Sequence, residues 1–388
     1  MKICAIICEY NPIHEGHIYQ IKQTRAITGC DYIIAIMSGS FTQRGIPAIY
    51  DKWLRTTAAL QSGIDMVIEL PAAFSVASAE RFAFGGVSIA NAIGAVDYLS
   101  FGCETDNIEL LSETADMLVS EPEEYLSLLK SQLSAGVSYA SARAFAVQQL
   151  IPDAKQVLNS PNAILGVEYI KALKRLNSKI RPFTVKRIGQ DETDSMLTSA
   201  FPSALAIRRA VQRGADCSQL VPADVSYLFR NAVPVFYEDM FYALKYKILS
   251  MSSDKIASAA GVSEGLENLI IYAAKNACSM DKLINSIKSK RYARTRICRI
   301  LTNLLLDISK EDYMLIDSAG IYARVLGIKK GSEKVLSEIT RKSSVPVIIN
   351  PKSSCHPGIK KDVFASDVRS VFDKNKCGRD YTEKFIVV

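Results

Sequence analysis

The sequence contains little histidine or tryptophan, with three histidines and one tryptophan among 388 residues. It has nine cysteines, an odd number, and none of them forms a Cys-x-x-Cys pair. A disulfide framework and a zinc knuckle both need paired cysteines at short spacings, so the sequence argues against both. Cys4 and Cys8 lie in an apolar run, where free thiols pack as small hydrophobes. We expect reduced thiols in a reducing compartment.

Long apolar runs are absent as well. The first run ends at Cys8, too early for a secretion signal or a bilayer span, and no later segment has about 18 uncharged apolar residues in succession. We therefore expect a soluble, cytoplasmic protein without membrane contact. Hydrophobic residues make up 48% and charged residues 22%, which is the balance of a folded chain. The net charge of +7 only weakly favours a polyanionic partner.

The first hundred residues alternate between short apolar runs and helical spacing. The runs predict buried strands at 3–8, 32–37, 66–70 and 96–101, and the spacing predicts helices at 16–28, 50–62 and 77–93. This alternation is typical of a Rossmann-like parallel sheet with helices on both faces. Ligands bind such sheets at the carboxyl ends of the strands, so the residues that follow each strand are the functional candidates.

The pattern changes after residue 107. Helical spacing at 110–118, 123–133, 141–150 and 163–176 predicts a helical insertion, and a strand at 183–187 and a helix at 203–212 resume the α/β pattern. The remainder is predicted to be mainly helical to about residue 341, followed by a strand-like segment at 345–349. The length favours two domains, which we place at residues 1–215 and 216–388.

The most informative motif is Asn11-Pro12-Ile13-His14-Glu15-Gly16-His17, where the first strand leads into the first helix. Gly16 lets the backbone approach a ligand, and the helix start offers free N–H groups that suit a phosphate. His14 and His17 can donate hydrogen bonds to oxygens that gain charge during in-line transfer. A structural turn and a metal site are the alternatives. A metal would need a third ligand, and Glu15 cannot readily join the histidines on one face.

The motif resembles the HIGH-type signature of the nucleotidyltransferase superfamily. Further blocks narrow the resemblance to the bacterial tRNA(Met) cytidine acetate ligases. They are Glu9-Tyr10-Asn11-Pro12, Ser40-Phe41-Thr42-Gln43-Arg44-Gly45, the run from Gly63 to Pro71, Phe101-Gly102, Ser160-Pro161-Asn162 and Ser203-Ala204-Leu205-Ala206-Ile207-Arg208. The resemblance covers residues 1 to about 215 well, and the rest in length and basic character. It implies an α/β nucleotidyltransferase domain with a helical insertion, followed by a mainly helical tRNA-binding domain.

The resemblance also implies a reaction. Members of this family form acetyl-adenylate from ATP and acetate and transfer the acetyl group to N4 of the wobble cytidine, position 34, of elongator tRNA(Met). The implied ATP site comprises Ile7, Cys8, Glu9, Tyr10, Asn11, Pro12, Ile13, His14, Glu15, Gly16, His17, Ile18, Tyr19, Gln20, Gly102, Asn162 and Arg187. Mg²⁺ could accompany ATP, although no carboxylate cluster marks a metal site. Neither the acid nor the tRNA follows from composition or spacing, and the oligomeric state cannot be read either.

The late superfamily motif departs from the usual pattern. Ser203-Ala204-Leu205-Ala206 stands where a serine-threonine pair is common, so a phosphate contact there would rest on Ser203, backbone N–H groups and Arg208. Residues after the second and third strands are secondary candidates. Arg44, Lys52 and Arg55 could bind pyrophosphate or tRNA, and Glu69 could be a buried cap or could orient a substrate.

A basic tract in the second half predicts RNA contact. It consists of Lys288, Lys290, Arg291, Arg294, Arg296 and Arg299, with Tyr292 inside it and no acid between residues 282 and 306. A row of cations binds phosphates by charge, whereas a solvated helix face is the ordinary alternative. Lys329-Lys330, Arg341-Lys342 and Lys360-Lys361 could extend the tract.

Two other functions are compatible with the same first motif. One is an adenylyl- or cytidylyltransferase acting on a phosphorylated small metabolite, against which the basic second half argues. The other is an RNA-binding module with a vestigial nucleotide site, against which the intact His14, Gly16 and His17 argue.

Overall fold

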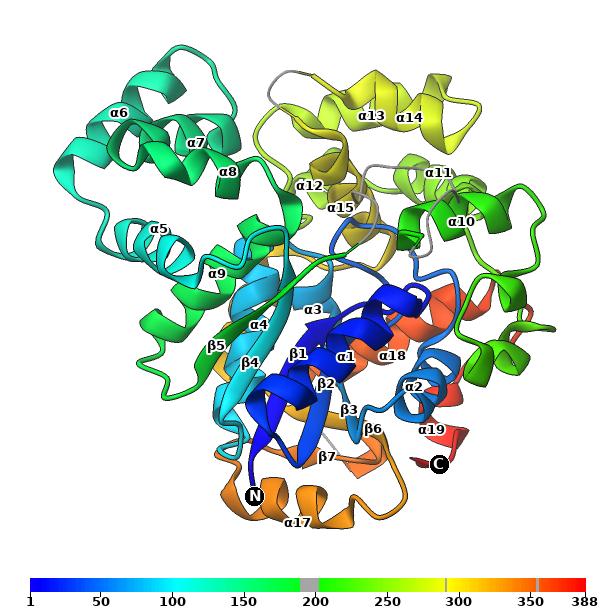
Figure 1. Cartoon of the computed structure of the whole chain (residues 1–388). Helices are drawn as coiled ribbons and strands as arrows, with labels where there is room; N and C mark the ends of the chain where they lie inside the picture. The colour runs from blue at the N-terminus through cyan, green and yellow to red at the C-terminus, as the bar shows by residue number, and fades with distance from the viewer. Residues whose placement is uncertain (189–201, 290–291, 354–355) are drawn as a thin grey trace.

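A single sheet runs through the molecule (Figure 1). The computed structural model describes residues 1–188, 202–289, 292–353 and 356–388. The sheet order is β5-β4-β1-β2-β3-β6-β7, with β8 beside β6. The strands are β1 (Ile3–Cys8), β2 (Tyr32–Ser38), β3 (Met66–Leu70), β4 (Tyr98–Cys103), β5 (Arg181–Lys186), β6 (Ala323–Ile328), β7 (Val347–Ile348) and β8 (Ile386–Val387). Strands β1 to β5 pair in parallel, which confirms the predicted α/β fold.

Helices cover both faces of this sheet. Those of the first half are α1 (Glu15–Thr28), α2 (Lys52–Gln61), α3 (Ala72–Ser75), α4 (Ala79–Ala92), α5 (Ile108–Ser120), α6 (Glu123–Ser134), α7 (Tyr139–Leu150), α8 (Lys155–Leu158), α9 (Pro161–Arg175) and α10 (Ala204–Gln212). Those of the second half are α11 (Phe241–Ser250), α12 (Ser253–Ala257), α13 (Leu266–Asn276), α14 (Met280–Ile287), α15 (Arg294–Leu305), α16 (Lys310–Ala319), α17 (Glu333–Lys342), α18 (Pro357–Ser370) and α19 (Arg379–Thr382).

Alternation along β1 explains its unbroken apolar sequence. Ile3, Ala5 and Ile7 belong to the core that contains residues of α4 and α9. Cys4 and Cys8 belong to the opposite core, with residues of α1 and α2. Both faces of the strand are therefore buried, as in parallel sheets covered by helices.

Two groups of helices extend from the sheet. The predicted helical insertion lies between β4 and β5, and its helices α6 and α7 project to the upper left in Figure 1. Helices α11 to α15 gather around a third core at the upper right. No helix of the described residues combines the length and apolarity that crossing a membrane requires.

Strands β6 and β8 are additions that the sequence pattern did not predict. β6 lies in a stretch we expected to be helical, and it pairs antiparallel with β3. β8, near the C-terminus, pairs with β6. Strands on both sides of residue 215 therefore share one sheet, and the division into two domains there stays a prediction.

A cluster of buried charges joins β6 and the C-terminal segment to the sheet. Lys52 Nζ donates to Glu69 Oε1 and to Asp380 Oδ1, at 2.7 Å each. Arg324 Nη1 lies 2.9 Å from Glu69 Oε2 and also pairs with Asp380. The four side chains are at most 2% exposed. The interpretation of Lys52 as a ligand for pyrophosphate or tRNA is therefore wrong, because its ammonium is buried and paired with the carboxylates of Glu69 and Asp380.

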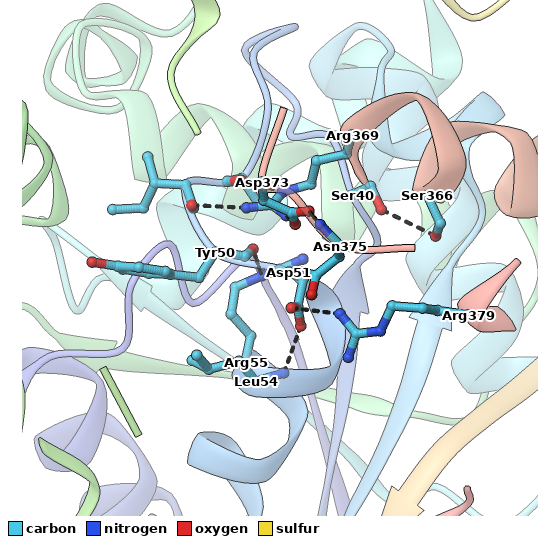
Figure 2. Close-up of polar contacts among 12 residues, drawn as sticks. Ser40, Tyr50, Asp51, Leu54, Arg55, Ser366, Arg369, Asp373, Asn375 and Arg379 are labelled. Atoms are coloured by element: carbon cyan, nitrogen blue, oxygen red, sulfur yellow. Dashed lines mark hydrogen bonds and ion pairs between the residues drawn. The ribbon is translucent and has the colours of Figure 1, made fainter. Parts of the chain in front are cut away.

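Arg55 is buried in the same way. Its guanidinium donates to the carbonyl oxygens of Tyr50 at 3.0 Å (Figure 2), Glu9 at 2.7 Å and Ser38 at 2.9 Å. The side chain is fully buried. The prediction that Arg55 binds pyrophosphate or tRNA is wrong, because the buried guanidinium instead donates hydrogen bonds to these backbone carbonyls.

The buried cluster generates a stability prediction. Arg324→Ala leaves Glu69 and Asp380 with only Lys52 to balance them, and we expect a loss of about 3–5 kcal/mol in the free energy of unfolding. Arg341→Ala, which removes a guanidinium 68% exposed and paired with Glu338, should cost about 1 kcal/mol or less. Chemical denaturation of both variants measures the difference, and equal losses would contradict a structural role for the buried cluster.

Candidate active site

The two histidines of the first motif close the start of α1. His14 is the N-cap residue, and its Nδ1 accepts a hydrogen bond from Gly16 N at 3.1 Å. His17 Nδ1 accepts in turn from His14 N at 3.2 Å, which completes a capping box made of imidazoles. Because each Nδ1 is an acceptor, a neutral ring must carry its proton on Nε2. Both histidines are thereby set up as Nε2–H donors.

Both rings are neutral at physiological pH. Burial and, to a lesser extent, the charges of Arg187 and Arg208 together lower the pKa of His14 to about 3. Burial, His14 and Arg187 likewise lower the pKa of His17 well below its usual value. The ring centroids lie 3.8 Å apart, so two charged imidazoles would repel strongly. The pair can therefore donate hydrogen bonds to phosphate oxygens without first losing or gaining a proton.

A pocket opens beside these rings, at the carboxyl ends of β4 and β5. Its lining is His14, Gly16, His17, Tyr19, Gln20, Gly102, Val185, Lys186, Arg187, Ile188, Pro202 and Ser203. Residues more than 180 positions apart thus meet at the strand ends, where α/β sheets bind ligands. Eight of the residues that the sequence analysis assigned to ATP or phosphate line this pocket.

The other residues of the first segment, by which we mean residues 7–20, do not line the pocket. Ile7, Tyr10 and Ile13 are buried in the cores. Asn11 Oδ1 accepts from Ile49 N at 2.8 Å, and the Asn11 carbonyl accepts from Arg208 Nη1 at 2.8 Å. Cys8, Glu9, Pro12, Glu15 and Ile18 do not line the described pocket either. Their assignment to ATP stays a prediction.

The start of α10 borders the same pocket. Ser203 Oγ accepts from Ala206 N at 3.2 Å, which confirms the predicted helix cap. Arg208 reaches the first segment through its bond to Asn11 rather than lining the pocket. Its contribution to a phosphate site would be its charge and its hold on Asn11.

Asn162 is held by an acidic residue that sequence reasoning did not single out. Glu104 Oε1 accepts from Asn162 Nδ2 at 2.7 Å, and Glu104 Oε2 accepts from Ala163 N at 2.9 Å. Ser160, not Asn162, is the N-cap of α9. Glu104 lies just after β4, and residues that follow the strands of such a sheet are functional candidates. Only the fold reveals its partner, because 58 residues separate Glu104 from Asn162.

The basic tract lies on and before α15. Arg294 pairs with Asp281 at 2.6 Å, so one of these cations meets an acid just outside the acid-free stretch. Arg296 stacks over the Tyr292 ring at 4.9 Å, and Arg299 Nη1 donates to the Gln43 carbonyl at 3.4 Å. Lys288 is exposed, and Lys290 and Arg291 lie outside the described residues. Contact between this tract and tRNA stays a prediction.

Comparison with known proteins identifies the family. The family model described as HIGH Nucleotidyl Transferase matches residues 1–384. A relative from Acetivibrio thermocellus is 38% identical over the full length of both chains, and one from Clostridium novyi is 41% identical, covering 97% of this chain and 96% of its own. Both are named tRNA(Met) cytidine acetate ligase. This chain belongs to the HIGH nucleotidyl transferase family, among the tRNA(Met) cytidine acetate ligases.

A solved structure resembles the ligase chain closely. The crystal structure of Thermotoga maritima TmcAL bound with alpha-thio ATP matches with a TM-score of 0.92 and 31% identity over the full length of both chains. The likeness spans the insertion and the C-terminal helices as well as the sheet. Within the part of this ligase-family chain that the structure describes, no group of three His, Cys, Asp or Glu side chains could hold a metal ion.

Gly102 offers a test of the pocket. A Cβ built on it would meet Arg187 Cγ at 3.5 Å and Gln20 Oε1 at 3.8 Å, which are ordinary contacts. We therefore expect Gly102→Ala to keep its melting temperature but to bind ATP about tenfold more weakly, since the methyl group narrows the pocket wall. Isothermal calorimetry with ATP and thermal denaturation measure the two effects. Unchanged ATP affinity would place the nucleotide elsewhere.

Proposed function

We propose that this protein activates acetate with ATP and transfers the acetyl group to N4 of the wobble cytidine of elongator tRNA(Met), producing N4-acetylcytidine. The names of its full-length relatives and the ATP analogue bound by the Thermotoga maritima protein support this proposal. The observation that carries it is the pair of neutral Nε2–H donors at the start of α1, beside a pocket that also contains Arg187.

The first step joins acetate to the nucleotide. An acetate oxygen attacks the α-phosphorus of ATP, the bond to the β,γ-diphosphate breaks, and pyrophosphate leaves with the electron pair of that bond. His14, His17 and the free N–H groups of α1 would donate to the phosphate oxygens, and Arg187 would offset their charge. No protein nucleophile takes part, so positioning and electrostatics supply the rate.

The second step transfers the acetyl group. The N4 amine of cytidine attacks the carbonyl carbon of acetyl-adenylate, AMP leaves with the bridging oxygen, and the amine loses a proton. The reacting base must be reached outside a duplex stack, which an anticodon loop permits. The basic tract of α15 would bind the backbone of that RNA by charge.

The competing function, nucleotide transfer to a phosphorylated metabolite, would use the same first segment. It gives no role to the cations of α15, and the full-length relatives carry the ligase name. Pyrophosphate–ATP exchange separates the two functions. The ligase would catalyse exchange when a carboxylic acid is present, whereas the competing enzyme would require the phosphorylated metabolite.

The third histidine provides a matched control for the catalytic role of His14. His356 caps α18 as His14 caps α1, with Nδ1 accepting from Gly358 N at 3.1 Å. We expect His14→Ala to lower acetate-dependent ATP–pyrophosphate exchange by about 10²–10³-fold, the usual effect of removing a donor to a developing oxyanion. His356→Ala should lose a helix cap, at a cost of about 1 kcal/mol, and keep its exchange rate. Equal exchange rates in the two variants would refute the assignment.

The RNA contact is tested separately. Arg296→Ala should weaken binding of elongator tRNA(Met) several-fold and reduce the slope of log affinity against log salt by about 1, because one phosphate contact is lost. ATP–pyrophosphate exchange should not change. Lys334→Ala, which removes an exposed cation of α17, is the control. Filter-binding titrations at several salt concentrations measure the slope, and identical slopes in all three proteins would exclude Arg296 from the RNA surface.

A further inference from the structure

One loop connects the nucleotide pocket with the basic helix. The β2–α2 loop, residues 39–51, follows the second strand, and most of its residues are buried. On one side it is bonded to the first segment. Glu9 Oε1 accepts from Gln43 N at 2.7 Å, and Asn11 Oδ1 accepts from Ile49 N at 2.8 Å. The loop is therefore fixed to the residues that lead directly to His14.

On its other side the loop touches the backbone of α15. A Cβ on Gly45 would lie 2.3 Å from Arg299 N and 2.6 Å from the Cys298 carbonyl carbon. Gly45 also has a φ of +73°, a conformation that side chains rarely adopt. Thr302 Oγ1 donates to the Gly45 carbonyl at 2.8 Å, and Arg299 Nη1 donates to the Gln43 carbonyl. Only glycine allows this backbone-to-backbone contact.

The loop is held rigidly by a third element, α18 (Figure 2). Arg369 Nε donates to the Ala48 carbonyl at 2.9 Å and its Nη2 to the Ile49 carbonyl at 2.8 Å. Ser40 and Ser366 share a hydrogen bond of 3.2 Å. Arg379, the first residue of α19, adds a bond to Asp51 at 2.9 Å. Because the loop is anchored from α18 and from the first segment, a displacement of α15 cannot be absorbed by movement of the loop.

We propose that Gly45 is a positioning residue for acetyl transfer, which fixes the RNA-carrying helix α15 relative to the acetyl-adenylate. This inference rests on the proposed function. A side chain at residue 45 would push α15 outward by about 1 Å to restore an ordinary contact. A misplacement of that size can lower the rate by up to about 100-fold when the reaction depends on the approach of two bound groups. Formation of the adenylate needs no RNA and should be unaffected.

The test compares Gly45→Ala with Gly136→Ala. Gly136 has a φ of +78°, with no atom within 4 Å of a built Cβ, so it reproduces the backbone strain without the collision. Three quantities are measured in each protein: acetate-dependent ATP–pyrophosphate exchange, the Kd for elongator tRNA(Met), and the single-turnover rate of acetyl transfer. We expect Gly45→Ala to slow transfer at least tenfold while exchange and Kd stay within twofold. Gly136→Ala should change none of the three.

A second pair of variants applies if Gly45→Ala does not fold. Thr302→Val removes the hydroxyl that donates to the Gly45 carbonyl. Tyr237→Phe removes the neighbouring hydroxyl, which contacts α15 through Thr302 at 3.0 Å and the Cys298 carbonyl at 3.1 Å but does not bond the loop, so it controls for loss of a bond within the helix group. We expect slower transfer in Thr302→Val only, again with unchanged exchange.

Three outcomes decide the inference. Transfer at the wild-type rate in Gly45→Ala, or in Thr302→Val where Gly45→Ala does not fold, would overturn it. A slower exchange together with a higher Kd and a lower melting temperature would also overturn it, because that pattern belongs to general loss of structure. A wild-type protein without acetate-dependent exchange would instead refute the proposed function itself.

Discussion

The capping hydrogen bonds that His14 and His17 accept at the start of α1 are the constraint on which the site depends. His14 and His17 each use Nδ1 to satisfy a backbone N–H at the start of α1, and burial keeps both rings neutral. The capping interaction thus does two things at once. It begins the helix, and it leaves an Nε2–H on each ring as a donor beside the pocket.

Other parts of the chain fix the position of this helix start relative to the helices of the second half. The β2–α2 loop meets the first segment, α15 and α18 in one place, and the cluster of Lys52, Glu69, Arg324 and Asp380 ties the C-terminal segment to the sheet. Buried charges of this kind contribute little net stability against apolar replacements, but losing one partner is costly. Their arrangement gives the C-terminal segment a defined place beside β3. Strands from both halves of the sequence therefore share one sheet.

Local patterns predicted the elements that position the pocket. The apolar runs at residues 3–8 and 66–70 coincide with β1 and β3, and Ser203 caps α10 as expected. β6 was missed because its partner β3 lies more than 250 residues earlier, and nothing local distinguishes it from the helices around it. Lys52 and Arg55 were misassigned for a related reason: a sequence shows that a cation exists, but not that carboxylates and carbonyls from distant segments enclose it. The pairing of Glu104 with Asn162 was hidden in the same way.

Nitrogen-15 NMR of the three histidine rings tests the central claim most directly. At neutral pH, His14 and His17 should both be neutral with the proton on Nε2, and their Nε2 signals should shift when a non-hydrolysable ATP analogue binds. His356, which has the same Nδ1 acceptor arrangement outside the pocket, should keep its signal. A proton on Nδ1 of either ring, a positive charge at neutral pH, or signals unmoved by the analogue would contradict the account.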